Sequence, residues 1–202
     1  MLFGSISRSR SLIKAIRRGT DATVINVESG APSTTRVELG DGSAVLIAPL
    51  GPSDRERYLT GLRRAGPDAL YKRFMTPVAR LTESQLRYLL EIDHRDHEAL
   101  MVVDEDSGEA VAVVRFVRLT PAGPVAEVAV LVIDDWQGIG LGKALCHLLA
   151  DRAVELGIER FEATVLMDNR PMLALLESIG SPRTVGRDGA SVMLEVTLPG
   201  PR

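Results

Sequence analysis

The chain has 202 residues, of which 45% are apolar and 25% charged, enough for one globular domain with its own core. Its net charge of −3 gives no case for a nucleic-acid partner. Its single cysteine cannot form an internal disulfide, which suits a reducing compartment. No apolar run approaches the roughly 20 residues that span a bilayer. We therefore expect a cytoplasmic protein without a membrane span.

The first 40 residues are interpreted as a basic tail followed by a linker, and residues 41–202 as one domain. Residues 1–19 contain five arginines and lysines and no acid. They lack the apolar stretch of a secretory signal. The tail is either a mobile segment or an arm that docks on an acidic partner or an anionic surface.

The first part of the domain is predicted to combine one strand with two helices. The strand is expected at residues 43–50 and the first helix within 52–66. Thr82 and Gln85 have the spacing of a capping box, which predicts the start of the second helix.

The second part of the domain is predicted to alternate strands with helices. We expect strands at 99–103, 109–119, 124–133, 160–167 and 191–198, and helices that begin in the glycines of 138–142 and near Pro171. This order indicates a mixed α/β domain, mostly antiparallel at first, with one βαβ unit late in the chain.

The sequence WQGIGLGKAL, residues 136–145, is a glycine-rich turn between a strand and a helix. Such turns point backbone N–H groups at a phosphate in several unrelated families. A Walker A loop is excluded, because a glutamine and an alanine replace its first glycine and its hydroxyl residue. A Rossmann fingerprint is excluded, because a lysine replaces its third glycine and the turn comes late in the chain. A structural turn without a ligand stays open, while Gln137, Gly140 and Gly142 match the pattern Q/R-x-x-G-x-G/A in full.

The region from Ala126 to Gly180 resembles the GNAT superfamily of acyl-CoA-dependent N-acetyltransferases, and the resemblance extends loosely back to about Ser43. It includes the strand AEVAVLVIDDW before the loop and DNRPM after the next strand. Within the superfamily, the chain looks most like bacterial protein lysine acetyltransferases of the Pat type. That likeness is carried by ALYKRFM, LTESQLRYLLEIDHRDHEALMVV, AEVAV and DNRPMLALLESIG.

The resemblance implies a GNAT-type α/β fold, with a mixed, mostly antiparallel central sheet of about seven strands flanked by about four helices. Some Pat-type enzymes carry a cyclic-nucleotide domain before the acetyltransferase. About forty residues precede the first predicted strand, too few for such a domain. We therefore do not expect control through a fused cyclic-nucleotide domain.

The resemblance also implies acetyl-CoA as the co-substrate, without a metal. Loop N–H groups would hold the diphosphate, and a strand that splays from its neighbour would hold the pantetheine arm and polarise the thioester carbonyl. The implied cofactor-binding residues are Val130, Leu131, Val132, Gln137, Gly138, Ile139, Gly140, Leu141, Gly142, Lys143 and Asn169. Lys143 is either a phosphate ligand or a solvated lysine, and Asn169 is also a natural N-cap of the next helix.

Glu127 is the candidate general base. A lysine amine is neutral in only about one molecule in 2,500 at pH 7, so direct transfer gains from a group that takes its proton. Glu127 is the only charged residue of an apolar strand, and its apolar flanks are expected to raise its pKa. The resemblance places a catalytic glutamate in this AEhAh pattern, where h is apolar. The alternative is a structural pair with Arg115 or Arg118 of the neighbouring strand.

Four other residues lie at positions that have to be considered for a catalytic or metal-binding role. Many GNAT enzymes have a tyrosine acid seven residues after the asparagine, where this chain has Leu176. The spacing of His94 and His97 is conceivable for a metal, but a polar helix-to-strand junction is preferred. Cys146 is predicted to be a small buried residue rather than an acyl carrier.

The function expected from this sequence is the transfer of an acetyl group to an amine, and the acceptor we favour is a lysine side chain of a protein. A small-molecule amine as the acceptor is one alternative. A non-catalytic acyl-CoA-binding regulatory protein is the other. The loops expected at 66–82 and 93–98 would shape the entrance for the acceptor.

Overall fold

A computed structural model describes residues 23–25, 34–75 and 80–200. The strands are β1 (Thr23–Ile25), β2 (Thr35–Glu38), β3 (Ala44–Pro49), β4 (His97–Asp104), β5 (Ala110–Arg118), β6 (Val125–Val132), β7 (Arg160–Leu166), β8 (Ser181–Asp188) and β9 (Ser191–Thr197). The helices are α2 (Arg55–Arg64), α3 (Pro67–Phe74), α4 (Glu83–Leu90), α5 (Leu141–Glu155) and α6 (Arg170–Ile179), with short 3₁₀ helices η1 (Pro52–Asp54) and η2 (Asp134–Trp136).

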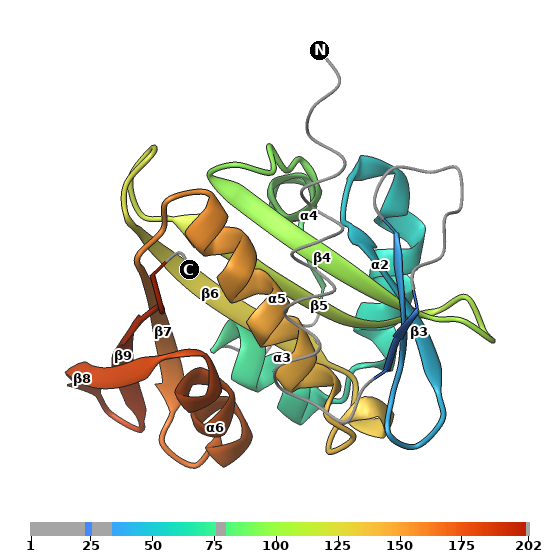
Figure 1. Ribbon diagram of the computed structural model, residues 1–202. Coiled ribbons are helices and arrows are strands. Elements are labelled where there is room, and N and C mark those ends of the chain that lie inside the picture. The colour runs from blue at the N-terminus through green and yellow to red at the C-terminus, as the bar shows by residue number, and fades with distance from the viewer. Residues whose placement is uncertain (1–22, 26–33, 76–79, 201–202) are drawn as a thin grey trace.

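The nine strands of the described residues belong to one sheet, in the order β1-β2-β3-β4-β5-β6-β7-β9-β8 (Figure 1). Among the described strands, β6 and β7 form the one parallel pair, and the other neighbours are antiparallel. The predicted mixed, mostly antiparallel sheet is confirmed. Within the described residues the sheet has nine strands and five α-helices flank it, close to the expected numbers of about seven strands and about four helices.

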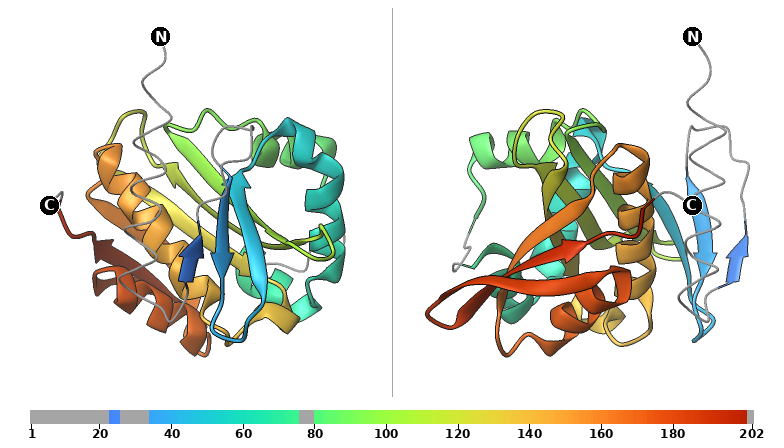
Figure 2. Two further views of the ribbon diagram at one scale, coloured as in Figure 1. Left: turned by 45° about the vertical axis from the view of Figure 1, so that its right-hand side comes forward. Right: turned by 60° about the vertical axis from the view of Figure 1, so that its left-hand side comes forward.

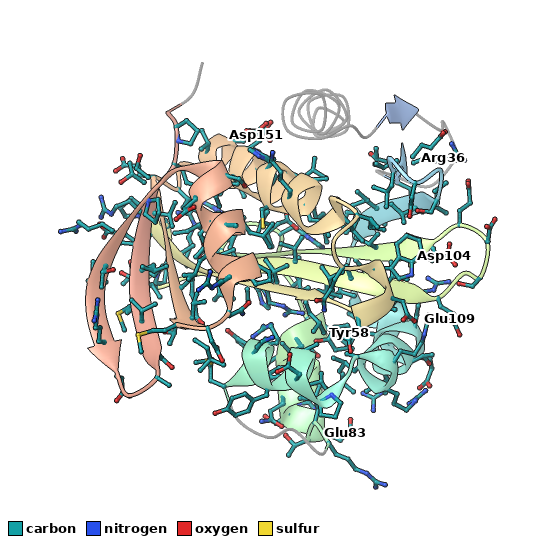
Figure 3. The ribbon with its side chains drawn as sticks, turned by 90° about the horizontal axis from the view of Figure 1, so that it is seen from below. Arg36, Tyr58, Glu83, Asp104, Glu109 and Asp151 are labelled. Atoms are coloured by element: carbon teal, nitrogen blue, oxygen red, sulfur yellow. The ribbon has the colours of Figure 1, made fainter. Side chains whose placement is uncertain are left out.

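The helices cover both faces of the sheet. Seen along the sheet, α5 lies on one face and α2, α3 and α4 on the other (Figure 3). The β1–β2 edge and the β8–β9 hairpin lie at opposite ends of the molecule (Figure 2). Helix α5 connects β6 to β7, which is the predicted βαβ unit.

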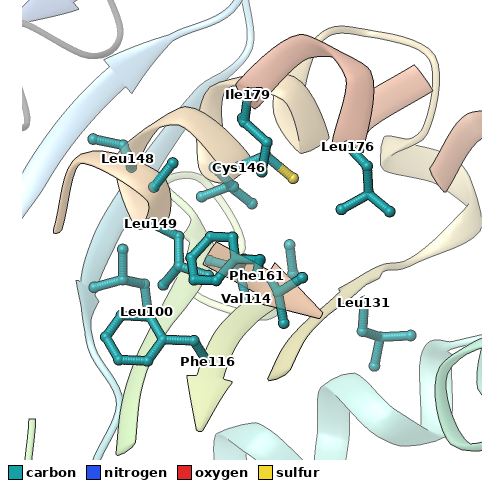
Figure 4. Close-up of a cluster of buried hydrophobic side chains, with 14 of the residues drawn as sticks. Leu100, Val114, Phe116, Leu131, Cys146, Leu148, Leu149, Phe161, Leu176 and Ile179 are labelled. Carbon is teal, nitrogen blue, oxygen red and sulfur yellow. The ribbon is translucent and has the colours of Figure 1, made fainter. Parts of the chain in front are cut away.

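The core lies on both sides of the central strands. Along β4, Val102 joins the cluster under α5, whereas its neighbour Met101 joins the cluster with α2 and α4. Phe116 and Phe161 lie under α5 with ring centroids 6.0 Å apart (Figure 4). Because β4 and β5 are buried on both faces, they hold β6 in a fixed position next to them.

The local signals for two helices are confirmed. The Thr82 side chain accepts a hydrogen bond from the Gln85 N–H at 3.2 Å, and Gln85 Oε1 accepts one from the Thr82 N–H at 2.9 Å. This is the predicted capping box at the start of α4. Helix α6 has Pro171 in its first turn, as predicted.

Four elements differ from the prediction: β1, β2, α3 and β8. Regular structure was expected from residue 43, but β2 pairs with β3 in a hairpin, so the sheet continues on the N-terminal side of the boundary drawn at residue 40. The four residues of β2 follow a run of glycine, proline, serine and threonine, and this composition led to the prediction of a linker. Helix α3 occupies a segment that was expected to be a loop. Strand β8 was not predicted, because almost all its side chains are exposed and its sequence shows no apolar alternation.

The basic segment 1–19 lies outside the described residues. Within the described part of the chain, no helix combines the length and the apolar character needed to cross a membrane.

Candidate functional site

The site is built where β6 and β7 separate. Only residues 125–127 of β6 are in register with β7, whereas β5 stays paired with β6 from residue 126 to residue 132. The two strands diverge from their shared end in Figure 1. The second half of β6 therefore has backbone N–H and C=O groups on its β7 side without a strand partner among the described residues. These groups belong to the segment that includes Val130–Val132.

A cleft of about 520 Å³ opens beside this part of β6, and we call it the loop cleft. It lies between β6, the glycine-rich loop, α3 and α6. Its lining residues are Asp68, Ala69, Lys72, Val130, Leu131, Val132, Trp136, Gln137, Gly138, Gly140, Gly142, Lys143, Asn169, Pro171, Met172 and Leu175. Two of the expected cofactor-binding residues, Ile139 and Leu141, are absent from this lining and pack in the core. The other nine come together here.

The glycines of the loop are required for different structural reasons. Gly138 has φ 81° and Gly140 has φ 89°, a left-handed backbone that other residues rarely adopt. Gly142 lies against α6, where a Cβ atom would approach Leu175 Cδ1 to 3.3 Å. The side chain of Gln137 donates from Nε2 to the carbonyl of Val132 at 3.0 Å. This hydrogen bond ties the loop to the end of β6.

The first turn of α5 has no side-chain cap and no acidic residue, and its N-cap is Gly140. The first N–H groups of a helix have no carbonyl partner within it, and the helix dipole adds positive potential at this end. Lys143 is exposed and also lines the loop cleft. The arrangement suits a phosphate or another anion.

Asn169 is the N-cap of α6 and also lines the loop cleft. Its Oδ1 accepts a hydrogen bond from the Met172 N–H at 3.3 Å. The N-cap alternative is therefore correct. It leaves the side-chain amide available to a molecule in the cleft, because no partner for Nδ2 is found within the described residues.

A second cavity, of about 330 Å³, lies farther back along β6 and α3, and we call it the Glu127 pocket. Its lining residues are Arg73, Phe74, Leu81, Gln85, Tyr88, Leu89, Arg115, Val117, Glu127 and Ala129. Because β6 and α3 also line the loop cleft, the two cavities are neighbours.

Glu127 is exposed in this pocket instead of being enclosed by apolar side chains. Within the described part of the chain, its carboxylate has no hydrogen bond or ion pair. Arg118 binds Asp96 at 3.0 Å. Arg115 donates to the carbonyl of Leu89 at 3.1 Å. The alternative in which Glu127 pairs with one of these arginines is therefore not found.

The two histidines of the 93–98 segment have separate partners. His94 Nδ1 lies 2.6 Å from Glu98. His97 Nε2 accepts a hydrogen bond from Arg115 at 3.1 Å, because a guanidinium only donates. Burial, together with the charge of Arg115, lowers the pKa of His97 to about 4. Within the described residues, no group of three or more His, Cys, Asp or Glu side chains could hold a metal.

Two other positions behave as small or apolar core residues. Burial raises the pKa of the Cys146 thiol to about 12, so it stays protonated and unreactive at neutral pH. Leu176 is fully buried. The position where many GNAT enzymes have a tyrosine therefore belongs to the core of this protein.

The sequence predicts that residues 66–82 shape the acceptor entrance as a loop, but it did not reveal the helix α3 within them. This helix supplies Asp68, Ala69 and Lys72 to the loop cleft and Arg73 and Phe74 to the Glu127 pocket. The signal that could have found it is a glycine followed by a proline at the first helical position, with an acid next to it.

Comparison with known proteins agrees with this architecture. Residues 68–180 match the family described as the acetyltransferase (GNAT) family. The chain is 36% identical over 163 residues to the acetyltransferase Pat of Mycolicibacterium smegmatis, which covers 81% of this chain and 48% of that protein. The chain thus spans about half the length of that relative. Acetyltransferase PA5475 of Pseudomonas aeruginosa is 31% identical over 144 residues, 70% of this chain and 77% of that protein.

A solved structure is similar in both sequence and fold. The GNAT domain of S. lividans PAT superimposes with a TM-score of 0.74 at 30% identity, and the match covers 82% of this chain and 97% of that one. Together with the family match over residues 68–180, this likeness shows that the chain belongs to the GNAT family of acetyltransferases.

Proposed function

We propose that this protein transfers an acetyl group from acetyl-CoA to the side-chain amine of a lysine in a protein. The observation that carries the proposal is the pair of cavities along β6. One is a cleft with unpaired backbone donors, and the other is a pocket with a carboxylate that has no partner in the described structure. The similarity to the two Pat proteins supports a protein lysine as the acceptor.

The loop cleft fits the parts of acetyl-CoA. The uncapped first turn of α5 offers N–H groups and positive potential to the diphosphate. The unpaired side of β6 offers strand partners to the pantetheine amides, and a strand N–H near Val130–Val132 would polarise the thioester carbonyl. Acetyl-CoA supplies the activated acyl group, and the chain supplies its orientation.

Glu127 acts as the base in this proposal. It precedes Val130 by three residues, about 10 Å along the strand, so it takes the lysine proton directly or through a water. The amine nitrogen then bonds to the acyl carbon while the carbon–sulfur bond breaks, and the nitrogen loses its second proton to water. Leu176 offers no acid, so CoA leaves as a thiolate and takes its proton from water.

The proposal is tested by CoA-thiol release in the presence of a mixed cell lysate, with the proteins then probed for acetyl-lysine. We expect Glu127→Gln to lower the rate by about 10²-fold or more. Glu162→Gln is the matched control. It makes the same change on β7, at the position aligned with Glu127, but outside the Glu127 pocket.

Each other outcome points to a different function. Thiol release without protein acetylation would replace the lysine acceptor with a small amine. Binding of acetyl-CoA without thiol release by the wild type would contradict catalysis and favour a regulatory acyl-CoA-binding protein. Equal rates for the wild type and Glu127→Gln would remove Glu127 from the mechanism.

A further inference from the structure

The guanidinium of Arg115 is buried in the wall of the Glu127 pocket without a counter-charge. The residue is 3% exposed, and its Nη1 atom is occupied by the Leu89 carbonyl and by His97. Its Nη2 atom has no hydrogen-bond partner, and no carboxylate within the described residues forms an ion pair with it. Buried charges in proteins are normally paired, so an unpaired guanidinium in the wall of a pocket indicates a partner that the described residues do not supply.

A second arginine lines the same pocket. Arg73 is half-buried, with its guanidinium 4.9 Å from the centroid of the Phe74 ring. It has no ion pair in the part of the chain that the structure describes. Burial lowers the pKa of Arg115 to about 10, so it is still charged at neutral pH. The pocket therefore has two cations against the single carboxylate of Glu127.

Two cations against one carboxylate disfavour the binding of an acceptor whose only charged group is an amine. A lysine side chain arrives as a cation, and an excess of positive charge in a partly desolvated pocket repels it. An acceptor that brings its own anion removes the repulsion. A carboxylate can accept a charge-assisted hydrogen bond from Nη2 of Arg115, the atom that has no partner within the described residues.

We propose that the Glu127 pocket selects acceptors with a carboxylate close to the reacting amine, and that Arg115, assisted by Arg73, binds this carboxylate. The inference rests on the proposed function, because it concerns the acceptor of that reaction. The carboxylate comes either from an aspartate or glutamate beside the lysine of a protein, or from the α-carboxylate of a free amino acid.

The competing explanation is purely structural. Through Leu89 and His97, Arg115 connects the end of α4 to β4 and β5. In that case a negative charge on the acceptor has no effect. A hydrogen bond between charged groups in such a site changes affinity by about 10- to 100-fold, which is easily measured.

The test uses peptides with one lysine and an aspartate at each neighbouring position in turn, each matched by the asparagine peptide. Free lysine and lysinamide form the second arm. Binding is measured by calorimetry, and transfer by CoA-thiol release. We expect the carboxylate member of at least one pair to bind and react about tenfold or more better than its amide. The arm in which the preference occurs identifies the source of the carboxylate.

Variants connect the preference to the pocket. Arg115→Gln keeps a donor for the Leu89 carbonyl and is expected to abolish the preference, while Arg73→Gln reduces it. Arg87→Gln is the control, because it makes the same charge change on α4 outside the pocket. The KM for acetyl-CoA is expected to stay unchanged in all three. Melting temperatures show whether Arg115→Gln is folded. If it is not, Arg115→Lys and the comparison of acid and amide peptides with the wild type still test the carboxylate preference.

The two proposals fail separately in this design. Transfer to acid and amide peptides at equal rates would overturn the carboxylate site and leave the acetyltransferase intact. Preferential binding without thiol release would keep the site and contradict the catalytic function. If the peptides show neither a binding preference nor transfer, both proposals are overturned.

Discussion

At the scale of single residues, Asn169 combines a structural and a ligand-facing role that substitutions can separate. Asn169→Ala removes the cap of α6 and is expected to lower the free energy of unfolding by about 1 kcal/mol. Asn169→Ser keeps a capping oxygen and is expected to preserve stability. Both lose the amide that faces the loop cleft, so both should raise the KM for acetyl-CoA. Denaturant unfolding and steady-state kinetics measure the two effects, and an unchanged KM in the serine variant would leave Asn169 a cap only.

His97 predicts how stability depends on pH. Its pKa is lowered from 6.5 to about 4 in the folded protein, chiefly by burial. Between these values the unfolded chain binds a proton that the folded protein does not, so the free energy of unfolding falls as the pH decreases from about 6.5 to 4. Urea unfolding across this range measures the slope. His97→Gln, which keeps an acceptor for Arg115, should have a shallower slope, and an identical slope would contradict this assignment.

At the scale of elements, the backbone of the glycine-rich loop gives a matched pair of variants. Gly140 (φ 89°) and Gly42 (φ 86°) both have left-handed backbones, but Gly42 lies in the turn between β2 and β3. Each alanine substitution should cost about 1 kcal/mol of stability from backbone strain. Only Gly140→Ala should also weaken acetyl-CoA binding, because it distorts the open turn of α5. Equal affinities in the two variants, measured by calorimetry, would argue against a ligand at the loop.

Elements with strong local signals could be predicted from sequence. Thr82 and Gln85 determine the start of α4 by hydrogen bonds between neighbours, so the sequence contains the whole interaction. Strand β8 is different: its side chains are exposed, and it is a strand because β9 pairs with it along its length. No sequence periodicity records a partner of that kind, which is why β8 was missed.

The candidate site could be predicted only where its residues are close in sequence. The loop from Gln137 to Lys143 carries its own signature, and the strand before it is adjacent in the chain. Arg73 lies on α3, which is far from Glu127 in sequence, and Arg115 lies on β5, the strand before β6. Only the packing of α3 and β5 beside β6 brings them into one pocket. Arg115 was considered as a partner of Glu127 because β5 is the neighbouring strand, whereas Arg73 was not, because its segment was expected to be a loop.

At the scale of the whole molecule, a buried ionic cluster ties α5 to the centre of the sheet. Glu98 of β4 is 3% exposed and accepts hydrogen bonds from Arg152 of α5 at 3.1 Å and from His94 at 2.6 Å. Burial would raise the pKa of Glu98, but these two partners outweigh it and lower the pKa. The cluster therefore favours a charged Glu98 and fixes α5 over β4.

Breaking this cluster should destabilise the whole domain. Arg152→Met leaves a buried carboxylate without its main cation, with an expected loss of about 3 kcal/mol in the free energy of unfolding. Adding Glu98→Gln removes that charge and should recover a substantial part of the loss. Chemical denaturation of the single and double variants measures this coupling, and additive effects would contradict it.

The separation of β6 from β7 has a consequence for self-association. A strand with unpaired backbone groups is normally a template for aggregation, which proteins avoid by covering or shortening their edges. Here the unpaired edge lies inside the sheet, and α3 and α6 border the cleft in front of it. We expect a narrow, flexible chain with amide groups to reach this edge more easily than a strand of another protein, which has side chains on both faces. The fold can therefore keep part of β6 unpaired without promoting self-association of the protein.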